Sequence, residues 1–196
     1  MVRLLLIRHA ATAVTGNNVL LGSTDVEASV AGLQQLERLP GLLENHRPDL
    51  WFCSPMHRAV QTVEYLHDLY SKDLKFQKDE RLREIDFGRW EQKSFDEIET
   101  SDPELIPAWS QYKDFVFPEG EAVDEFIGRV KTALDEFKGM DGKEIGVIAH
   151  GGVIRTMICL ALGLDPKNYL LFTISPASLT ILDLYPEGGV LTGMNM

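Results

Sequence analysis

Unbroken apolar runs alternate along the chain with segments of helical periodicity. Several of these runs are short and lack the polar alternation of a half-solvated strand, so they predict strands buried on both faces. They are VRLLLI (residues 2–7), PDLWFCS (48–54) and EIGVIA (144–149). Near the end of the sequence, SLTILDLY (178–185) predicts a further strand and VLTGM (190–194) an added edge strand.

Helical periodicity appears between these runs. The clearest case is 122–138, where Phe126, Val130, Leu134 and Phe137 fall on one side of the predicted helix. The other predicted helices are 29–39, which we expect Pro40-Gly41 to end, 57–70, with Val63, Leu66 and Tyr70 on one face, and 151–162.

Strands that alternate with helices predict an α/β fold, in which a mostly parallel sheet carries helices on both faces. Residues 78–118 interrupt the alternation, because charges, prolines and aromatic side chains follow one another there without a clear period. We interpret this segment as loops and short helices that form a small cap or lid on a single domain of residues 1–196.

The charge balance narrows the range of partners. The 196 residues carry 19 Lys and Arg against 30 Asp and Glu, a net charge of -11. A nucleic-acid surface needs a basic stripe, so we expect no nucleic acid partner. A site for an anionic small molecule must then be a local pocket of positive charge.

The first apolar run also bears on location. Only Leu4 to Ile7 precede Arg8-His9, far short of the roughly 20 residues of a membrane helix and too few for a signal-peptide core. Cys53 and Cys159 lie far apart in apolar stretches without metal-ligand spacing, which predicts buried free thiols. We therefore expect a cytoplasmic protein without a membrane partner, as a monomer or a homodimer.

Reactive side chains follow the predicted strands where each strand ends. Arg8-His9 closes the first strand, Arg58 comes shortly after the second, and His150-Gly151 follows the strand of residues 144–149. Ligands of open α/β sheets bind at the carboxyl ends of the strands, so these side chains are expected to converge. Arginine grips phosphate oxygens in a bidentate manner, and the free N–H groups at a helix N-terminus also favour an anion. The pattern predicts an anion site that contains nucleophiles.

An acidic group would complete such a site by giving a proton to a departing oxygen, which is worth about 100- to 10,000-fold in rate. The segment LREIDFGRWE supplies Glu84, Asp86 and Glu91. Spacing alone does not choose among the three carboxylates.

The ordered set LIRHAAT, SPMHRAVQT, LREIDFGRWE, PEGE and AHGGVIR resembles the histidine phosphatase superfamily, the phosphoglycerate mutase-like proteins. The resemblance implies a three-layer sandwich and a phosphohistidine formed on His9. It also implies a phosphate pocket of Arg8, Arg58 and His150, with Glu84 protonating the leaving alcohol and then activating water.

The resemblance further implies phosphate contacts from Gly151 and from the loop that contains Thr15, and it implies neither a metal nor a cofactor. Some positions depart from the family's usual pattern, with Ala10 in place of Gly and Ala11 and Thr15 in place of more polar side chains. Ala28 and Gln92 replace a usual Leu and a usual Gly, which we expect to affect packing or access. Arg155 is expected to lie on a helix surface or in a structural ion pair.

The short chain most resembles the alpha-ribazole 5'-phosphate phosphatases of cobalamin synthesis, so a phosphomonoesterase for a small phosphorylated metabolite is the first expectation. A cofactor-dependent phosphoglycerate mutase is the alternative, and a non-catalytic phosphate-binding module is a third. The short segment between Arg89 and Pro118 favours an open, hydrolytic pocket over a mutase that excludes water.

Overall fold

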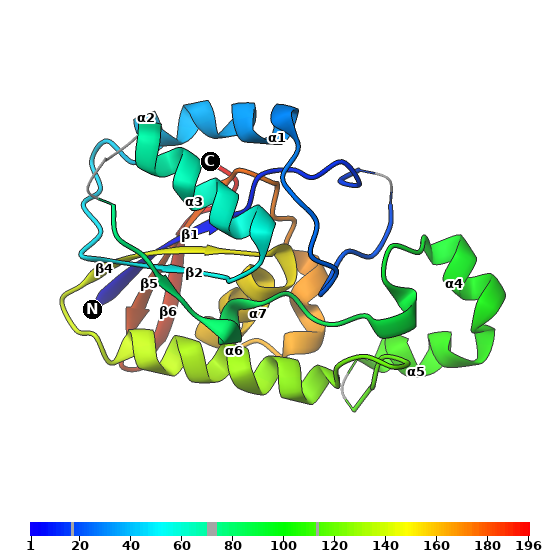
Figure 1. The fold of residues 1–196 in the computed structure, drawn as a ribbon. Coiled ribbons are helices and arrows are strands. Elements are labelled where there is room, and N and C mark those ends of the chain that lie inside the picture. The colour runs from blue at the N-terminus through cyan, green and yellow to red at the C-terminus, as the bar shows by residue number, and fades with distance from the viewer. Residues whose placement is uncertain (17, 70–73, 113) are drawn as a thin grey trace.

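The computed structural model describes residues 1–16, 18–69, 74–112 and 114–196. Across these residues a six-stranded sheet forms the middle layer, with the strand order β3-β2-β4-β1-β5-β6 (Figure 1). The strands are β1 (Val2–Arg8), β2 (Leu50–Cys53), β3 (Gln77–Lys78), β4 (Glu144–Ala149), β5 (Leu179–Tyr185) and β6 (Gly188–Gly193). Strands β1 to β4 run parallel, whereas β5 is antiparallel to both β1 and β6. The predicted α/β fold with a mostly parallel sheet is confirmed.

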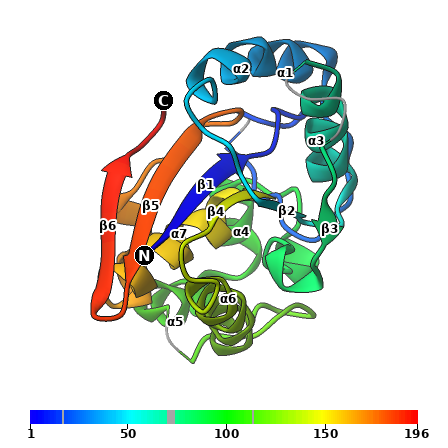
Figure 2. The same cartoon turned by 90° about the vertical axis from the view of Figure 1, so that its left-hand side faces the viewer.

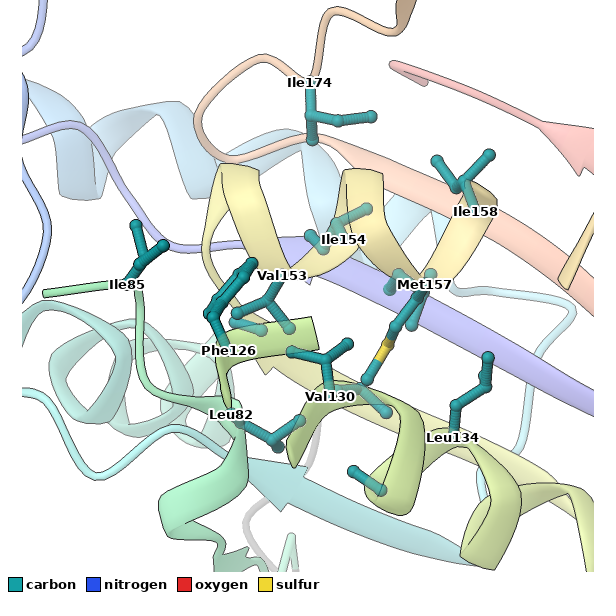
Figure 3. Close-up of a cluster of buried hydrophobic side chains, with 14 of the residues drawn as sticks. Leu82, Ile85, Phe126, Val130, Leu134, Val153, Ile154, Met157, Ile158 and Ile174 are labelled. Atoms are coloured by element: carbon teal, nitrogen blue, oxygen red, sulfur yellow. The ribbon is translucent and has the colours of Figure 1, made fainter. Parts of the chain in front are cut away.

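Helices cover both faces of this sheet, as Figure 2 shows. On one face lie α1 (Val30–Gln34), η1 (Gln35–Arg38), α2 (Leu39–Leu42) and α3 (His57–Leu69). On the other lie α6 (Val123–Lys138) and α7 (Gly151–Ala161). Figure 3 shows side chains of α7, Val153 and Met157 among them, directed toward Val130 on α6.

The continuous apolar run of β1 serves both faces. Leu4 and Leu6 belong to the core under α6 and α7, whereas Leu5 and Ile7 belong to the core under the other helices. Successive side chains of a strand point to opposite faces, so a strand between two helical layers needs apolar residues at every position. The prediction of a strand buried on both faces is confirmed.

The helical segment after Ser29 does not end at Pro40-Gly41, so that prediction is wrong. The chain passes from α1 through the 3-10 turn η1 into α2, which contains Pro40 and runs to Leu42. Pro40 sits in the first turn of α2, where a missing backbone N–H leaves no helical hydrogen bond unmade. Of the residues assigned to one face of α3, Val63 and Leu66 are buried, and Tyr70 lies outside the described residues.

Residues 78–118 contain short helical elements and loops, as their irregular pattern predicts. These are η2 (Glu80–Leu82), η3 (Gly88–Trp90), α4 (Phe95–Ser101), η4 (Pro103–Leu105) and α5 (Ile106–Gln111). Trp90 is fully buried and packs against Trp109, Phe115 and Phe117. In Figure 1, α4 and α5 lie at the end of the molecule toward which β1 runs.

After α7 the chain forms η5 (Pro166–Leu171) and a loop that leads into β5. Both cysteines are free and buried, as the sequence predicts. Among the described helices none is long and apolar enough to cross a membrane.

Candidate active site

The register of β1 and β4 brings two histidines side by side. Arg8 is paired with Ala149 in this parallel ladder, so the next residue of each strand, His9 and His150, leaves the sheet at the same level. The His9 backbone N–H donates to the Ala149 carbonyl oxygen at 2.9 Å, and the two imidazole centroids are 5.0 Å apart. Both rings are buried, with 3% and 0% of their residue surface exposed.

The His9 ring is held in one tautomer. Its Nδ1 lies 2.7 Å from the carbonyl oxygen of Ala10, an acceptor, so Nδ1 carries the hydrogen. Burial lowers the pKa of His9 well below its usual range, and the charges of Arg8 and Arg58 add to the shift. Near neutral pH the ring is therefore uncharged, and the lone pair resides on Nε2.

His150 is neutral for similar reasons. Burial lowers its pKa well below the usual range, with Arg58 the next largest cause. Its Nε2 lies 2.7 Å from the Ser54 hydroxyl, on the residue that follows β2. Its Nδ1 is buried without a hydrogen-bond partner among the described residues, which leaves one ring nitrogen available to a ligand.

Arg58 lies fully buried on α3 and donates to two backbone carbonyls, Thr24 at 2.9 Å and Gly22 at 2.7 Å. Its Nε is buried and has no hydrogen-bond partner in the part of the chain that the structure describes. Burial lowers the pKa of this guanidinium, while the negative charge of Glu84 opposes that shift. The side chain is thus anchored at one edge and keeps donors for an anion.

Arg8 follows the same scheme. One guanidinium nitrogen donates to the Ile174 carbonyl at 2.6 Å, and none of the described residues offers the buried Nε a partner. Burial lowers the pKa of Arg8 to about 10, against the opposing charge of Glu84. The guanidinium lies against the start of α7, where a Cβ added to Gly151 would be 3.5 Å from Arg8 Cζ.

The structure distinguishes the three candidate carboxylates by what they contact. Glu84 accepts a hydrogen bond from Gly152 N–H at 2.8 Å, and it lines two cavities that Arg8 also lines. A Cβ at Gly152 would come within 2.4 Å of Glu84 Oε1, so only glycine permits this approach. Asp86 instead accepts from Gly88 N–H within a local turn.

Glu91 binds backbone groups. Its carboxylate accepts from the N–H groups of Gly22, Ser23, Thr24 and Phe87. The carbonyls of Gly22 and Thr24 in turn hold Arg58, so Glu91 fixes the loop on which that arginine rests. Sequence spacing gave no sign of this role.

Two further positioning residues were missed by sequence reasoning. Arg129 on α6 donates to the carbonyls of Arg81, Arg83 and Glu84 and pairs with Glu121. Thr62 on α3 accepts from Ala10 N–H at 2.9 Å and donates to the Arg58 carbonyl at 2.7 Å. Arg129 thus holds the segment that contains Glu84, and Thr62 joins the loop after His9 to the helix that contains Arg58.

The Ala10 methyl group fits the turn after His9. Ala10 is fully buried in the core under α1 to α3 and does not have a positive φ. Thr15 faces the cavity beside His9, although its hydroxyl also accepts from Thr12 N–H at 2.9 Å. The Ala11 carbonyl accepts from both Ser29 N–H and the Ser29 hydroxyl, which ties this loop to the start of α1.

Two adjoining cavities open on Arg8 and Glu84, one of them also on His9, whereas Arg58 and His150 are in the lining of neither. The His9 cavity has a volume of about 200 Å³ and is lined by Arg8, His9, Thr15 and Glu84, among others. The Arg155 cavity has a volume of about 280 Å³ and is lined by Arg8, Glu84, Gly151, Gly152 and Arg155, together with aromatic side chains. Arg8 and Glu84 belong to both, so they mark the junction.

Of the two expectations for Arg155, a helix surface or a structural ion pair, the ion pair is not found among the described residues. Arg155 is half-buried in the wall of the Arg155 cavity, and no carboxylate of the described residues forms an ion pair with it. The described residues also contain no group of three or more His, Cys, Asp or Glu side chains arranged to hold a metal ion.

Comparison with known proteins adds independent information. A sequence model of the histidine phosphatase superfamily (branch 1) matches residues 4–196. Phosphoserine phosphatase 1 of Hydrogenobacter thermophilus is 28% identical over 198 residues, which cover 100% of this chain and 93% of that protein. Adenosylcobalamin/alpha-ribazole phosphatase of Escherichia coli is 27% identical over 98% of this chain and 95% of its own.

The crystal structure of the alpha-ribazole phosphatase from Shigella flexneri superposes with a TM-score of 0.86, at 24% identity, over 99% of this chain and 96% of that one. This likeness extends the agreement to the fold. The family match spans nearly the whole chain and includes all the segments that converge on the two cavities. The chain therefore belongs to the histidine phosphatase superfamily and is a phosphatase.

Proposed function

We propose that the chain hydrolyses phosphate monoesters of small metabolites through a phosphohistidine on His9. One observation carries the proposal. The His9 ring is neutral and buried, donates from Nδ1 to Ala10 O and so keeps the lone pair on Nε2, and the charges of Arg8 and Arg58 are near enough to lower its pKa. Among the described residues, neither arginine has a partner for its Nε. A nucleophile with a fixed tautomer between cations is what attack on an anionic phosphoryl group requires.

In the first step, Nε2 of His9 attacks the phosphorus atom and the ester P–O bond breaks. Arg8, Arg58 and His150 Nδ1 bind the non-bridging oxygens, whose charge they offset as it shifts. Thr15 and the N-terminal turn of α7 at Gly151 add contacts at the rim. Glu84, at the junction of the cavities, gives its proton to the departing oxygen.

In the second step, water attacks the phosphorus of the phosphohistidine. Glu84 takes a proton from that water, the P–N bond breaks, and inorganic phosphate leaves with His9 neutral again. The charge of the phosphoryl group is met by arginine and histidine throughout, and no step uses a metal or a cofactor.

The relatives' names suggest two substrates for a first panel, alpha-ribazole 5'-phosphate and phosphoserine. Hydrolysis of the former would place the chain in cobalamin synthesis, as its overall likeness to that group suggests. The panel needs simple alkyl phosphates as well, because a permissive enzyme would cleave these at comparable rates.

The mechanism is tested by quenching the enzyme within milliseconds of mixing with a ³²P-labelled ester. We expect an acid-labile, base-stable phosphoenzyme whose label maps to His9. The His9→Ala variant is expected to lose both the label and about 1,000-fold or more in kcat. His67→Ala, which removes an exposed histidine of α3, is the matched control and should match the unmodified enzyme.

Turnover by His9→Ala at an unchanged rate would remove the proposal. The mutase alternative is tested in the same preparation by following 3-phosphoglycerate isomerisation with and without bisphosphoglycerate. Cofactor-dependent isomerisation faster than phosphate release would replace hydrolysis as the principal reaction.

A further inference from the structure

Arg155 shares an unusual property with the two arginines of the phosphate site. In the described part of the chain, three arginines have a buried Nε that lacks a hydrogen-bond partner, namely Arg8, Arg58 and Arg155. Other half-buried arginines are paired, Arg3 with Asp183 and Arg129 with Glu121. A buried donor without a partner is costly, so such groups in a cavity wall point to a ligand that satisfies them.

The position of Arg155 on α7 fixes its relation to the phosphate site. Gly151 lies against the Arg8 guanidinium, and Arg155 follows four residues later on the same face of the helix. Residues at this spacing have Cβ atoms about 5–6 Å apart. Arg155 is therefore rooted one helical turn beyond the residue that contacts Arg8, and its charge is near enough to lower the pKa of Arg8, after burial.

The remaining wall of the Arg155 cavity is largely aromatic. Tyr112 and Tyr169 stack with their ring centroids 4.5 Å apart, and Trp109, Phe117 and Phe126 also line the space. Tyr112 has a φ of 64°, a strained value for a residue with a side chain. Leu170, 70% exposed, lines the cavity beside Tyr169. Walls of this kind keep water from an ion pair and so strengthen it.

We propose that Arg155 binds a carboxylate of the leaving alcohol, so that the preferred substrate is a small phosphate monoester with a carboxylate a few bonds from the ester oxygen. This inference rests on the proposed function, because it takes the phosphate to lie at His9. A single guanidinium matches one carboxylate in bidentate geometry. A second phosphate group would call for several donors, whereas a single guanidinium of Arg155 suffices for a carboxylate.

The test uses pairs of esters that differ in the carboxylate, phosphoserine against phosphoethanolamine and 3-phosphoglycerate against glycerol 3-phosphate. We expect kcat/KM to be about 10- to 100-fold higher for the carboxylate member of each pair. Arg155→Gln should abolish that preference, mostly by raising KM, and should change kcat/KM for the other member less than about twofold. Arg155→Lys should retain part of the preference, because lysine keeps the positive charge but cannot form the two parallel hydrogen bonds of a guanidinium to a carboxylate.

Lys131→Gln, which removes an exposed cation from α6, controls for the change in net charge and should leave both members unaffected. An equal loss on both members, or no loss on either, in Arg155→Gln would overturn the inference. Calorimetric binding of phosphoserine to His9→Ala and to His9→Ala/Arg155→Gln tests the same point without turnover, and equal affinities would also overturn it. Failure of the unmodified enzyme to hydrolyse any ester would instead count against the proposed function.

Discussion

At the scale of the residue, backbone carbonyl groups orient the side chains of the site. His9 Nδ1 is bound to Ala10 O, Arg8 to Ile174 O, and Arg58 to the carbonyls of Gly22 and Thr24. Each of these acceptors belongs to a loop whose position is fixed by other contacts. Gly22 is the sensitive position among these acceptors, because a Cβ there would lie 1.9 Å from the Ile85 carbonyl oxygen.

Gln92 provides a test at a single residue. It is exposed and has a φ of 60°, in the left-handed region that glycine adopts without steric cost. We expect Gln92→Gly to raise the free energy of unfolding by about 0.5 kcal/mol, the steric relief of about 1–2 kcal/mol being offset by the backbone entropy of glycine. The same change at Gln34, exposed within α1, should lower it by about 1 kcal/mol.

Urea denaturation of the two variants measures the change in the free energy of unfolding at each position, which we expect to be positive for Gln92→Gly and negative for Gln34→Gly. A decrease at both positions would show that the strain at residue 92 is compensated by contacts of its side chain.

At the scale of the element, helix α6 holds the segment that contains Glu84 in place through the side chain of Arg129. The Arg129 guanidinium donates to the backbone carbonyls of Arg81, Arg83 and Glu84. Its charge is balanced by an ion pair with Glu121. Phe126 and Val130 on the same helix are buried in the core, which fixes the position of Arg129. A helix that contributes no reactive group to the proposed mechanism thereby sets the position of Glu84, the proposed general acid.

Arg129→Met should therefore affect substrates unequally. An alkyl phosphate has a poor leaving group and needs the proton from Glu84, so we expect its kcat/KM to fall about 10- to 100-fold. For p-nitrophenyl phosphate, whose leaving group departs without a proton, the decrease should be less than about threefold. Steady-state kinetics with both esters measures the ratio, and Glu84→Gln should reproduce it.

A uniform decrease on both esters would mean that Arg129 only stabilises the fold. Thermal unfolding of the same variant does not separate these cases, because a loss of about 1–3 kcal/mol is expected from the broken hydrogen bonds in either one, so the ratio of the two kcat/KM values decides.

The elements and their order could be predicted because they depend on local patterns. The run Leu4 to Ile7 indicates a buried strand, and two parallel strands that are directly followed by His9 and His150 bring the two histidines to one edge. The contacts of Glu91 and Thr62 could not be predicted, since each joins residues far apart in the sequence. Glu91 lies 67 to 69 residues from the N–H groups of the loop it binds.

At the scale of the whole molecule, a chain with a net charge of -11 contains a small buried region of positive charge. Two neutral histidines are enclosed in that region, and their folded-state pKa values lie well below the usual 6.5. Below pH 6.5 the unfolded chain binds protons at these residues that the folded chain does not. Stability is therefore lost as pH falls below that value, and it is recovered above it.

We expect the Tm to decrease between pH 7.5 and pH 5.5, a range in which carboxylates of the unfolded chain are still ionised. The variant His9→Gln/His150→Gln should show a shallower decrease, because glutamine does not titrate. Scanning calorimetry across this range gives both slopes. Equal slopes would assign the pH dependence to other groups.

The central place of β1 has a consequence for synthesis on the ribosome. This strand is made early, yet both of its sheet neighbours, β4 and β5, lie more than a hundred residues later in the chain. Its apolar side chains must stay uncovered while those residues are translated, which exposes them to off-pathway association and makes the strand a target for chaperones. His9 reaches its final surroundings only when β4 docks, so the nascent chain stays inert toward cellular phosphate esters until the sheet is assembled.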